Sequence, residues 1–211
     1  MMDSDAAAAE KAIGFLSIAE RIKRELRHSW LSDGRRESVA EHTWFIALLA
    51  LLTYRRLQEP VALERVLAMA IVHDIAEAEV GDIPFFEQSE RKTRKAALEL
   101  AAMDRISSLL PDPEGAFVRE LWLEFEKGQT IEAKFVRALD HLEVQAQHNL
   151  ADLNTWEPIE HELVYTKMDD RCAHDEFLQK LLLHVRGGAE RKMKLAGIDV
   201  EAVKSRIAES R

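Results

Sequence analysis

Residues 37–52 read ESVAEHTWFIALLALL and predict the helix around which this fold is built. Ser38 and Glu41 have the spacing of a capping box, in which each residue's side chain accepts a hydrogen bond from the other's backbone N–H. A helix therefore begins near Val39. It is apolar on nearly all sides, as expected for a helix at the centre of a core. His42 interrupts this apolar sequence and is the first candidate for a functional group.

Helical periodicity continues on both sides of this segment. We expect further helices at about 6–27, 60–80, 90–110, 114–127, 130–149, 156–168, 170–186 and 189–209. Gly81, Gly128 and the pair Gly187-Gly188 are predicted to end or separate helices. The 211 residues include only 8 glycines and 5 prolines, which favours long elements, and no stretch alternates long enough to predict a sheet. The sequence predicts an all-α helical bundle, with residues 1–211 forming a single domain.

Composition excludes several classes of protein. With 32% charged and 47% hydrophobic residues, the chain is neither disordered nor fibrous. The net charge of −9 disfavours a nucleic-acid polymer as partner. The longest uncharged stretch, residues 43–54, is too short to cross a membrane, and the absence of a secretory signal leads us to expect a cytoplasmic protein. Cys172 is the single cysteine, which excludes an internal disulfide and fits a reducing compartment.

Polar residues interrupt three of the apolar helices. They are His42, the dipeptide His73-Asp74, and Asp140. A lone histidine in such a helix is most simply a core residue, but burying two imidazoles and two carboxylates separately would cost several kcal/mol each. A shared divalent cation would satisfy all four, and manganese, cobalt, iron and zinc each suit these ligand types. The second dipeptide, His174-Asp175, lies in a polar stretch and is expected at the surface.

Longer motifs surround these candidate ligands. They are 37–42 (ESVAEH), 73–77 (HDIAE) leading to 80–83 (VGDI), 121–126 (LWLEFE) and 133–140 (AKFVRALD). With them the chain resembles the HD-domain metal-dependent phosphohydrolases, in the branch that contains bacterial 5′-deoxynucleotidases and HD domain-containing protein 2. The resemblance covers residues 10–185 or so and leaves the helical tail at about 189–209 without a parallel.

The resemblance implies a helical homodimer that hydrolyses nucleoside 5′-monophosphates with 2′-deoxy sugars. It implies a single divalent transition metal ion held by His42, His73, Asp74 and Asp140. The catalytic residues it implies are Glu77, which handles protons, and Asp82, which contacts the sugar. Arg27, late in the first predicted helix, is the best match for a phosphate-binding arginine. His28 stands where the bacterial enzymes carry tryptophan, so Trp30 is a candidate replacement, with a purely structural role as the alternative.

Two rival interpretations remain open at this stage. The same fold could act on another small phosphate ester or a signalling nucleotide, or the chain could be a non-catalytic regulatory domain that keeps its metal for structure. His141 and His148 follow Asp140 without a matching role, and we expect them at the surface or behind the ligands.

Overall fold

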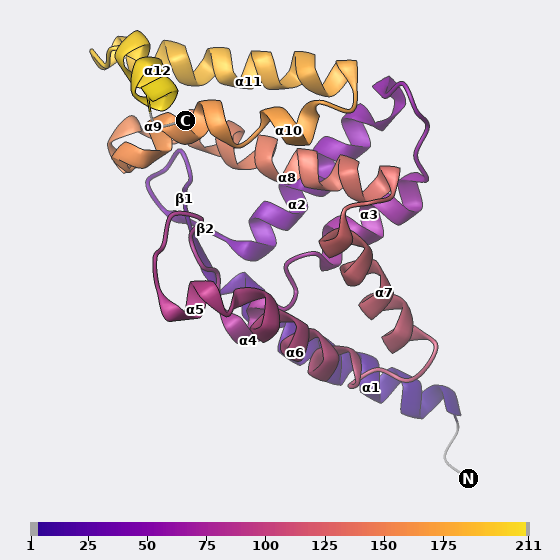
Figure 1. The fold of residues 1–211 in the computed structure, drawn as a ribbon. Helices are drawn as coiled ribbons and strands as arrows, with labels where there is room; N and C mark the ends of the chain where they lie inside the picture. Colours follow the sequence, from indigo (N-terminus) through magenta and orange to yellow (C-terminus); the bar gives the residue numbers. More distant parts are fainter. Residues whose placement is uncertain (1–3, 210–211) are drawn as a thin grey trace.

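Helix α2 (Val39–Thr53) begins where the capping box predicts it. The backbone N–H of Glu41 donates to Ser38 Oγ at 3.3 Å, and the backbone N–H of Ser38 donates to Glu41 Oε2 at 2.8 Å. In this computed structural model, which describes residues 4–209, α2 lies at the centre and packs against α3 (Leu63–Val72) and α8 (Ile131–Leu150) (Figure 1). Their contact faces are fully buried and include Ile46, Met69, Phe135, Leu139 and Leu142.

The other helices surround this central group (Figure 1). They are α1 (Ser4–Ala19), α4 (Glu77–Val80), α5 (Glu90–Thr93), α6 (Lys95–Ser107), α7 (Glu114–Lys127), α9 (Pro158–Thr166), α10 (Asp169–Cys172), α11 (Glu176–Leu195) and α12 (Val200–Glu209). Within residues 4–209, three 3₁₀ turns connect the elements, η1 (Glu20–Lys23), η2 (Tyr54–Arg56) and η3 (Leu153–Thr155). The predicted all-α class is confirmed, and no helix in the described part of the chain is long and apolar enough to cross a membrane.

A short β-hairpin corrects the first predicted helix. Instead of continuing to residue 27, α1 ends at Ala19, and β1 (Leu26–Trp30) pairs antiparallel with β2 (Arg36–Ser38). Gly34, with φ of +85°, sits in the turn between the strands. Gln147 on α8 donates a hydrogen bond of 2.7 Å from Nε2 to the Trp30 carbonyl, which ties the hairpin to the central helices. The expectation that no sheet forms is therefore wrong in this segment.

Several predicted helix boundaries are also wrong, and the helices expected at 170–186 and 189–209 are replaced by α10, α11 and α12. The segment expected at 60–80 divides, because α3 ends at Val72 and α4 starts only at Glu77. The segment expected at 90–110 is α5 and α6, separated at Arg94. Conversely, α11 runs through Gly187-Gly188 without a break. A Cβ atom at Gly188 would lie 2.8 Å from Asn149 Nδ2 on α8, so the missing side chain lets α8 and α11 pack closely.

Cys172 lies at the end of α10, inside the main core where α10 packs against α8 and α11. Its side chain is completely buried. Burial raises the pKa of the thiol to about 12. The residue is therefore an unreactive part of the apolar packing.

Candidate active site

The four predicted ligands meet where α2, the end of α3 and α8 come together. His42 Nε2 lies 3.2 Å from Asp140 Oδ1 and 3.7 Å from Asp74 Oδ2, and His73 Nε2 lies 3.1 Å from Asp74 Oδ2. Ligand atoms of His42, His73 and Asp140 all fall within 4.8 Å of one another. The structure thus brings two imidazoles and two carboxylates to one point.

Both imidazoles are oriented from behind. His73 Nδ1 lies 2.8 Å from the Ala70 carbonyl, which can only accept, so Nδ1 carries the proton and Nε2 presents its lone pair. His42 Nδ1 lies 2.5 Å from Glu143 Oε2. Both Nε2 atoms are buried and make no well-aligned hydrogen bond among residues 4–209, although a carboxylate oxygen lies 3.1 or 3.2 Å from each. Buried nitrogens aimed at two carboxylates fit a divalent metal ion, because a hydrogen bond to the opposite ring nitrogen, as seen here, is typical of metal-binding histidines.

Glu143 is a functional residue that the sequence analysis missed. It is almost fully buried on α8, one turn after Asp140, and its carboxylate holds His42. Its position on the apolar face of a predicted helix is the signal that could have identified it.

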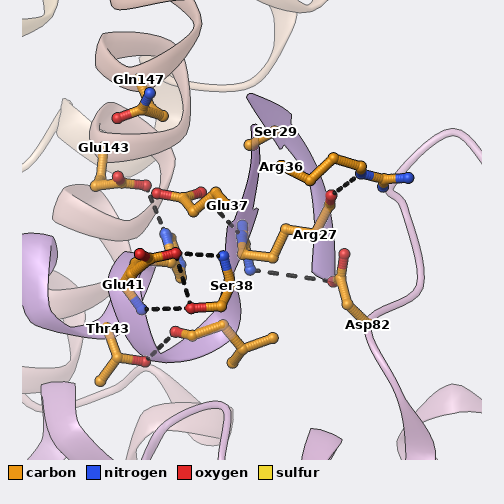
Figure 2. Close-up of polar contacts among 12 residues, drawn as sticks. Arg27, Ser29, Arg36, Glu37, Ser38, Glu41, Thr43, Asp82, Glu143 and Gln147 are labelled. Atoms are coloured by element: carbon orange, nitrogen blue, oxygen red, sulfur yellow. Dashed lines mark hydrogen bonds and ion pairs between the residues drawn. The ribbon is translucent and has the colours of Figure 1, made fainter. Parts of the chain in front are cut away.

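Arg27 lies on β1, not on a helix as expected, yet it reaches the predicted ligands. Its Nη1 is 3.4 Å from Asp74 Oδ2 and 4.0 Å from Asp82 Oδ1, and its Nε is 3.6 Å from Glu37 Oε2. Figure 2 shows Arg27 between Glu37 and Asp82. The guanidinium therefore places a positive charge beside the carboxylates predicted to bind the metal, at the wall of the cavity described below.

Glu77 begins α4 and is buried beside the ligands. Its Oε1 lies 3.4 Å from Lys95 Nζ, whereas its Oε2 has no hydrogen-bond partner within the described chain. Burial, reinforced by the charges of Asp74 and Asp82, raises the pKa of Glu77 well above its usual value. Lys95 also pairs with Glu99 at 3.1 Å, and this helical i,i+4 pair gave the sequence analysis no reason to place Lys95 in the site.

Asp82 follows a sharp turn at Gly81, whose φ is +80°. The backbone N–H of Asp82 donates to Glu25 Oε1 at 2.9 Å, and a Cβ on Gly81 would approach that same oxygen to 3.1 Å. A residue without a side chain is therefore needed at position 81, both for its φ angle and for space. The turn places Asp82 in the cavity wall with Arg27 and Glu77.

A cavity of about 240 Å³ extends away from the ligands. One wall is a face of α8, formed by Asp140, His141, Val144, Gln145 and His148. The facing walls come from β1, from the segment after α4 that carries Phe85 and Phe86, and from α9. The site is therefore elongated, with the candidate metal ligands at one end.

Several polar residues in the cavity wall were not predicted as site residues. His148 is buried, so the prediction of a surface position is wrong for this residue. His141 is partly buried, and both histidines line the cavity. Glu160 on α9 is buried as well, and burial raises its pKa to about 7. Burial lowers the pKa of His148 to about 4, so its imidazole is neutral at neutral pH.

Trp30 and the second His-Asp dipeptide lie elsewhere. Trp30 is not among the residues that line the cavity, and its ring lies under the Arg36 guanidinium at 5.8 Å. His28 lines the cavity instead, with its ring centroid 4.9 Å from that of Phe86 in an edge-to-face arrangement. Asp175, expected at the surface, is buried because it caps α11 and accepts a hydrogen bond from the Gln58 backbone at 2.8 Å.

Comparison with known proteins gives consistent results. Residues 19–180 match the HD domain family. The 5′-deoxynucleotidase HDDC2 of Xenopus laevis is 37% identical over 149 residues, covering 68% of this chain and 71% of the relative. That of Bos taurus is 31% identical over 191 residues, or 90% of each chain. A crystal structure described as a predicted metal-dependent phosphohydrolase from Magnetospirillum magnetotacticum MS-1 superposes with a TM-score of 0.78 at 28% identity, covering 94% of this chain and 99% of that one. The family match, the relatives and the arrangement of ligands agree, and the chain belongs to the HD domain family.

Proposed function

We propose that this protein is a metal-dependent 5′-deoxynucleotidase, which hydrolyses a 2′-deoxynucleoside 5′-monophosphate to the deoxynucleoside and phosphate. The observation that carries the proposal is the convergence of the buried Nε2 atoms of His42 and His73 with Asp74 and Asp140 at one end of an elongated cavity. The curated relatives named 5′-deoxynucleotidase support the same activity. The single metal ion would be manganese, cobalt, iron or zinc, since all accept this mixed ligand set.

The residues around the ligands have complementary roles in this reaction. A bound divalent metal ion would supply Lewis acidity toward the phosphate and lower the pKa of a water molecule. Glu77 would accept the proton of the attacking water through its unpartnered Oε2 and return a proton to the departing 5′ oxygen. The raised pKa of Glu77 suits a group that returns a proton as well as accepting one.

Arg27 and Asp82 would bind the rest of the substrate's reactive half. The Arg27 guanidinium, 3.4 Å from Asp74, would offset the charge of the phosphoryl oxygens. Asp82, fixed by the turn at Gly81, would accept a hydrogen bond from the 3′-hydroxyl of the sugar. A close fit there would leave little room for a 2′-hydroxyl, which accounts for a preference for deoxynucleotides.

The proposed assembly is a homodimer. Large apolar side chains are exposed on α1 and α2, among other elements, where Ile13 is 66%, Trp44 64% and Leu52 69% exposed. Large apolar side chains left in water favour association with another protein surface. Sedimentation analysis would test this assembly, and a monomer at micromolar concentration would contradict it.

Phosphate release from a substrate panel tests the function. The panel contains deoxynucleoside and ribonucleoside 5′-monophosphates and other small phosphate esters, each assayed with the four metals. We expect deoxynucleoside monophosphates to have the highest kcat/KM. If another ester has a higher kcat/KM, that ester replaces the deoxynucleotides as the proposed substrate. Metal binding without turnover of any ester would favour a regulatory domain.

A further inference from the structure

The cavity is longer than the chemistry at the metal ligands requires. Asp140 and His148 lie on the same face of α8, eight residues apart, which is roughly 12 Å along the helix. Val144 lies one turn from each of them and Leu163 on α9 lines the same cavity, so apolar side chains lie beside Gln145 in the middle of the cavity, between its two ends. Phosphate, sugar and base follow one another in the same order in a nucleotide.

The end of the cavity away from the ligands, called here the remote end, consists of His28, Ser29, His148 and Glu160. Glu160 Oε1 lies 3.7 Å from His28 Nε2 and 3.8 Å from His148 Nε2, both too far for hydrogen bonds. His28 Nε2 is buried and lacks a hydrogen-bond partner in the part of the chain that is described. Buried polar atoms in proteins are normally paired, so this group of atoms has capacity for a ligand.

Glu160 has a separate structural role that uses its other oxygen. Its Oε2 accepts a hydrogen bond of 2.6 Å from the backbone N–H of Glu157 in the capping box of α9. This bond fixes the carboxylate at the cavity wall and leaves Oε1 directed toward the two histidines. The helix cap therefore gives Oε2 of Glu160 a hydrogen-bond partner but gives none to Oε1.

We propose that the remote end binds the hydrogen-bonding edge of the substrate's nucleobase. Glu160 Oε1 accepts an N–H group of the base, and His28 Nε2 pairs with the neighbouring polar atom of the same edge. Val144 and Leu163 flank the ring. This inference rests on the proposed function, because it assumes that the phosphate lies at the metal ligands.

The variants Glu160→Gln and His28→Phe, assayed on two kinds of substrate, test the inference. The first kind is the four deoxynucleoside monophosphates, and the second is 2-deoxyribose 5-phosphate, which keeps the phosphate and sugar but has no base. Glu160→Gln retains an oxygen for the Glu157 N–H, and His28→Phe retains a ring against Phe86. Glu162→Gln is the matched control on α9, because Glu162 pairs with Arg206 and does not line the cavity.

We expect each test variant to lower kcat/KM for the nucleotides about tenfold or more, mainly through KM, and to change their order of preference. Turnover of 2-deoxyribose 5-phosphate should stay within about twofold of wild type, and the control should behave as wild type on both. An equal loss on both kinds of substrate would overturn the inference, since it would show a structural effect on the whole site. An unchanged kcat/KM on both kinds of substrate would also overturn it, because a water molecule would then be the hydrogen-bond partner of these buried polar atoms.

The proposed function can fail separately. If wild type hydrolyses none of these nucleotides, that function falls, and calorimetric titration with 2′-deoxyadenosine and 2′-deoxycytidine then decides the base site. Binding by wild type that weakens at least tenfold in Glu160→Gln would support it. Absent or unchanged binding would overturn it.

Discussion

The two ends of the cavity are built from different kinds of structure. At the end with the four candidate metal ligands, called here the metal-binding end, the side chains project from central helices, and each imidazole is held by a hydrogen bond of 2.5 or 2.8 Å from behind. At the remote end, the groups come from a hairpin, the far turns of α8 and a short helix, and the spacings between His28, His148 and Glu160 are 3.7 and 3.8 Å. Bond cleavage needs fixed geometry, whereas base recognition can change with a few side chains. The difference indicates which end can vary without loss of the reaction.

The largest expected effect comes from breaking the metal-binding end. Asp140→Ala removes one of the four converging ligands, so metal content and activity should both be lost, and the melting temperature should fall because bound metal stabilises the folded state. Metal analysis of the purified variant and phosphate release measure this. Asp170→Ala, at an exposed position of α10, is the control. Undiminished metal content in Asp140→Ala would refute the four-ligand assignment.

A smaller effect is expected from a change that leaves the ligands intact. Glu77→Gln keeps the size of the side chain and removes the base, so kcat should fall about 100-fold while metal binding persists. Single-turnover kinetics with metal analysis on the same sample measure both quantities. Turnover close to wild type would remove Glu77 from proton transfer and leave it a buried partner of Lys95.

In the cavity wall beside Arg27, Asp82 should control sugar selectivity. Asp82→Asn weakens a charge-assisted hydrogen bond, so kcat/KM for deoxynucleotides should fall about 10- to 100-fold. A 3′-deoxy substrate should react equally with variant and wild type, because it lacks the hydroxyl in question. If the variant loses stability but discriminates deoxy, 3′-deoxy and ribose sugars as before, Asp82 only stabilises its loop.

The smallest effect is expected at Ser29 in the remote end. Its Oγ lies 3.3 Å from His148 Nε2, a long contact, so Ser29→Ala should cost about 0.5–1.5 kcal/mol of stability. This corresponds to a drop of roughly 1–6 °C in Tm, with kcat/KM changed by less than about threefold. Thermal unfolding and steady-state kinetics measure these. A tenfold loss of kcat/KM at unchanged Tm would show that the remote end tolerates substitution no better than the metal-binding end.

The central part of this site could be predicted because its signals are local. The capping box at Ser38 and Glu41 depends on neighbouring residues, and His42 and Asp140 stand out because they interrupt apolar helices. Burial of an unpaired polar group is costly, so such interruptions point to a shared partner. The positions of these ligands in space then follow from the packing of α2, α3 and α8.

The hairpin and the remote end could not be predicted because distant contacts determine them. Strand β1 has five residues without regular alternation of burial, and it is held by Gln147 and His148 on α8. Arg27 was expected near the phosphate on a helix, but a strand carries it to the cavity. Gly188 favours a helix break locally, yet close packing against Asn149 allows α11 to continue.

Cys172 gives this fold an internal reporter of its own motions. Because the thiol is enclosed by the core and its pKa is raised to about 12, a thiol reagent must wait until α10 separates from α8 and α11. The rate of thiol labelling therefore measures how often the core opens, and no engineered probe is needed. Comparing that rate with and without added metal would reveal whether a bound ion steadies α8 as far as its contact with α10.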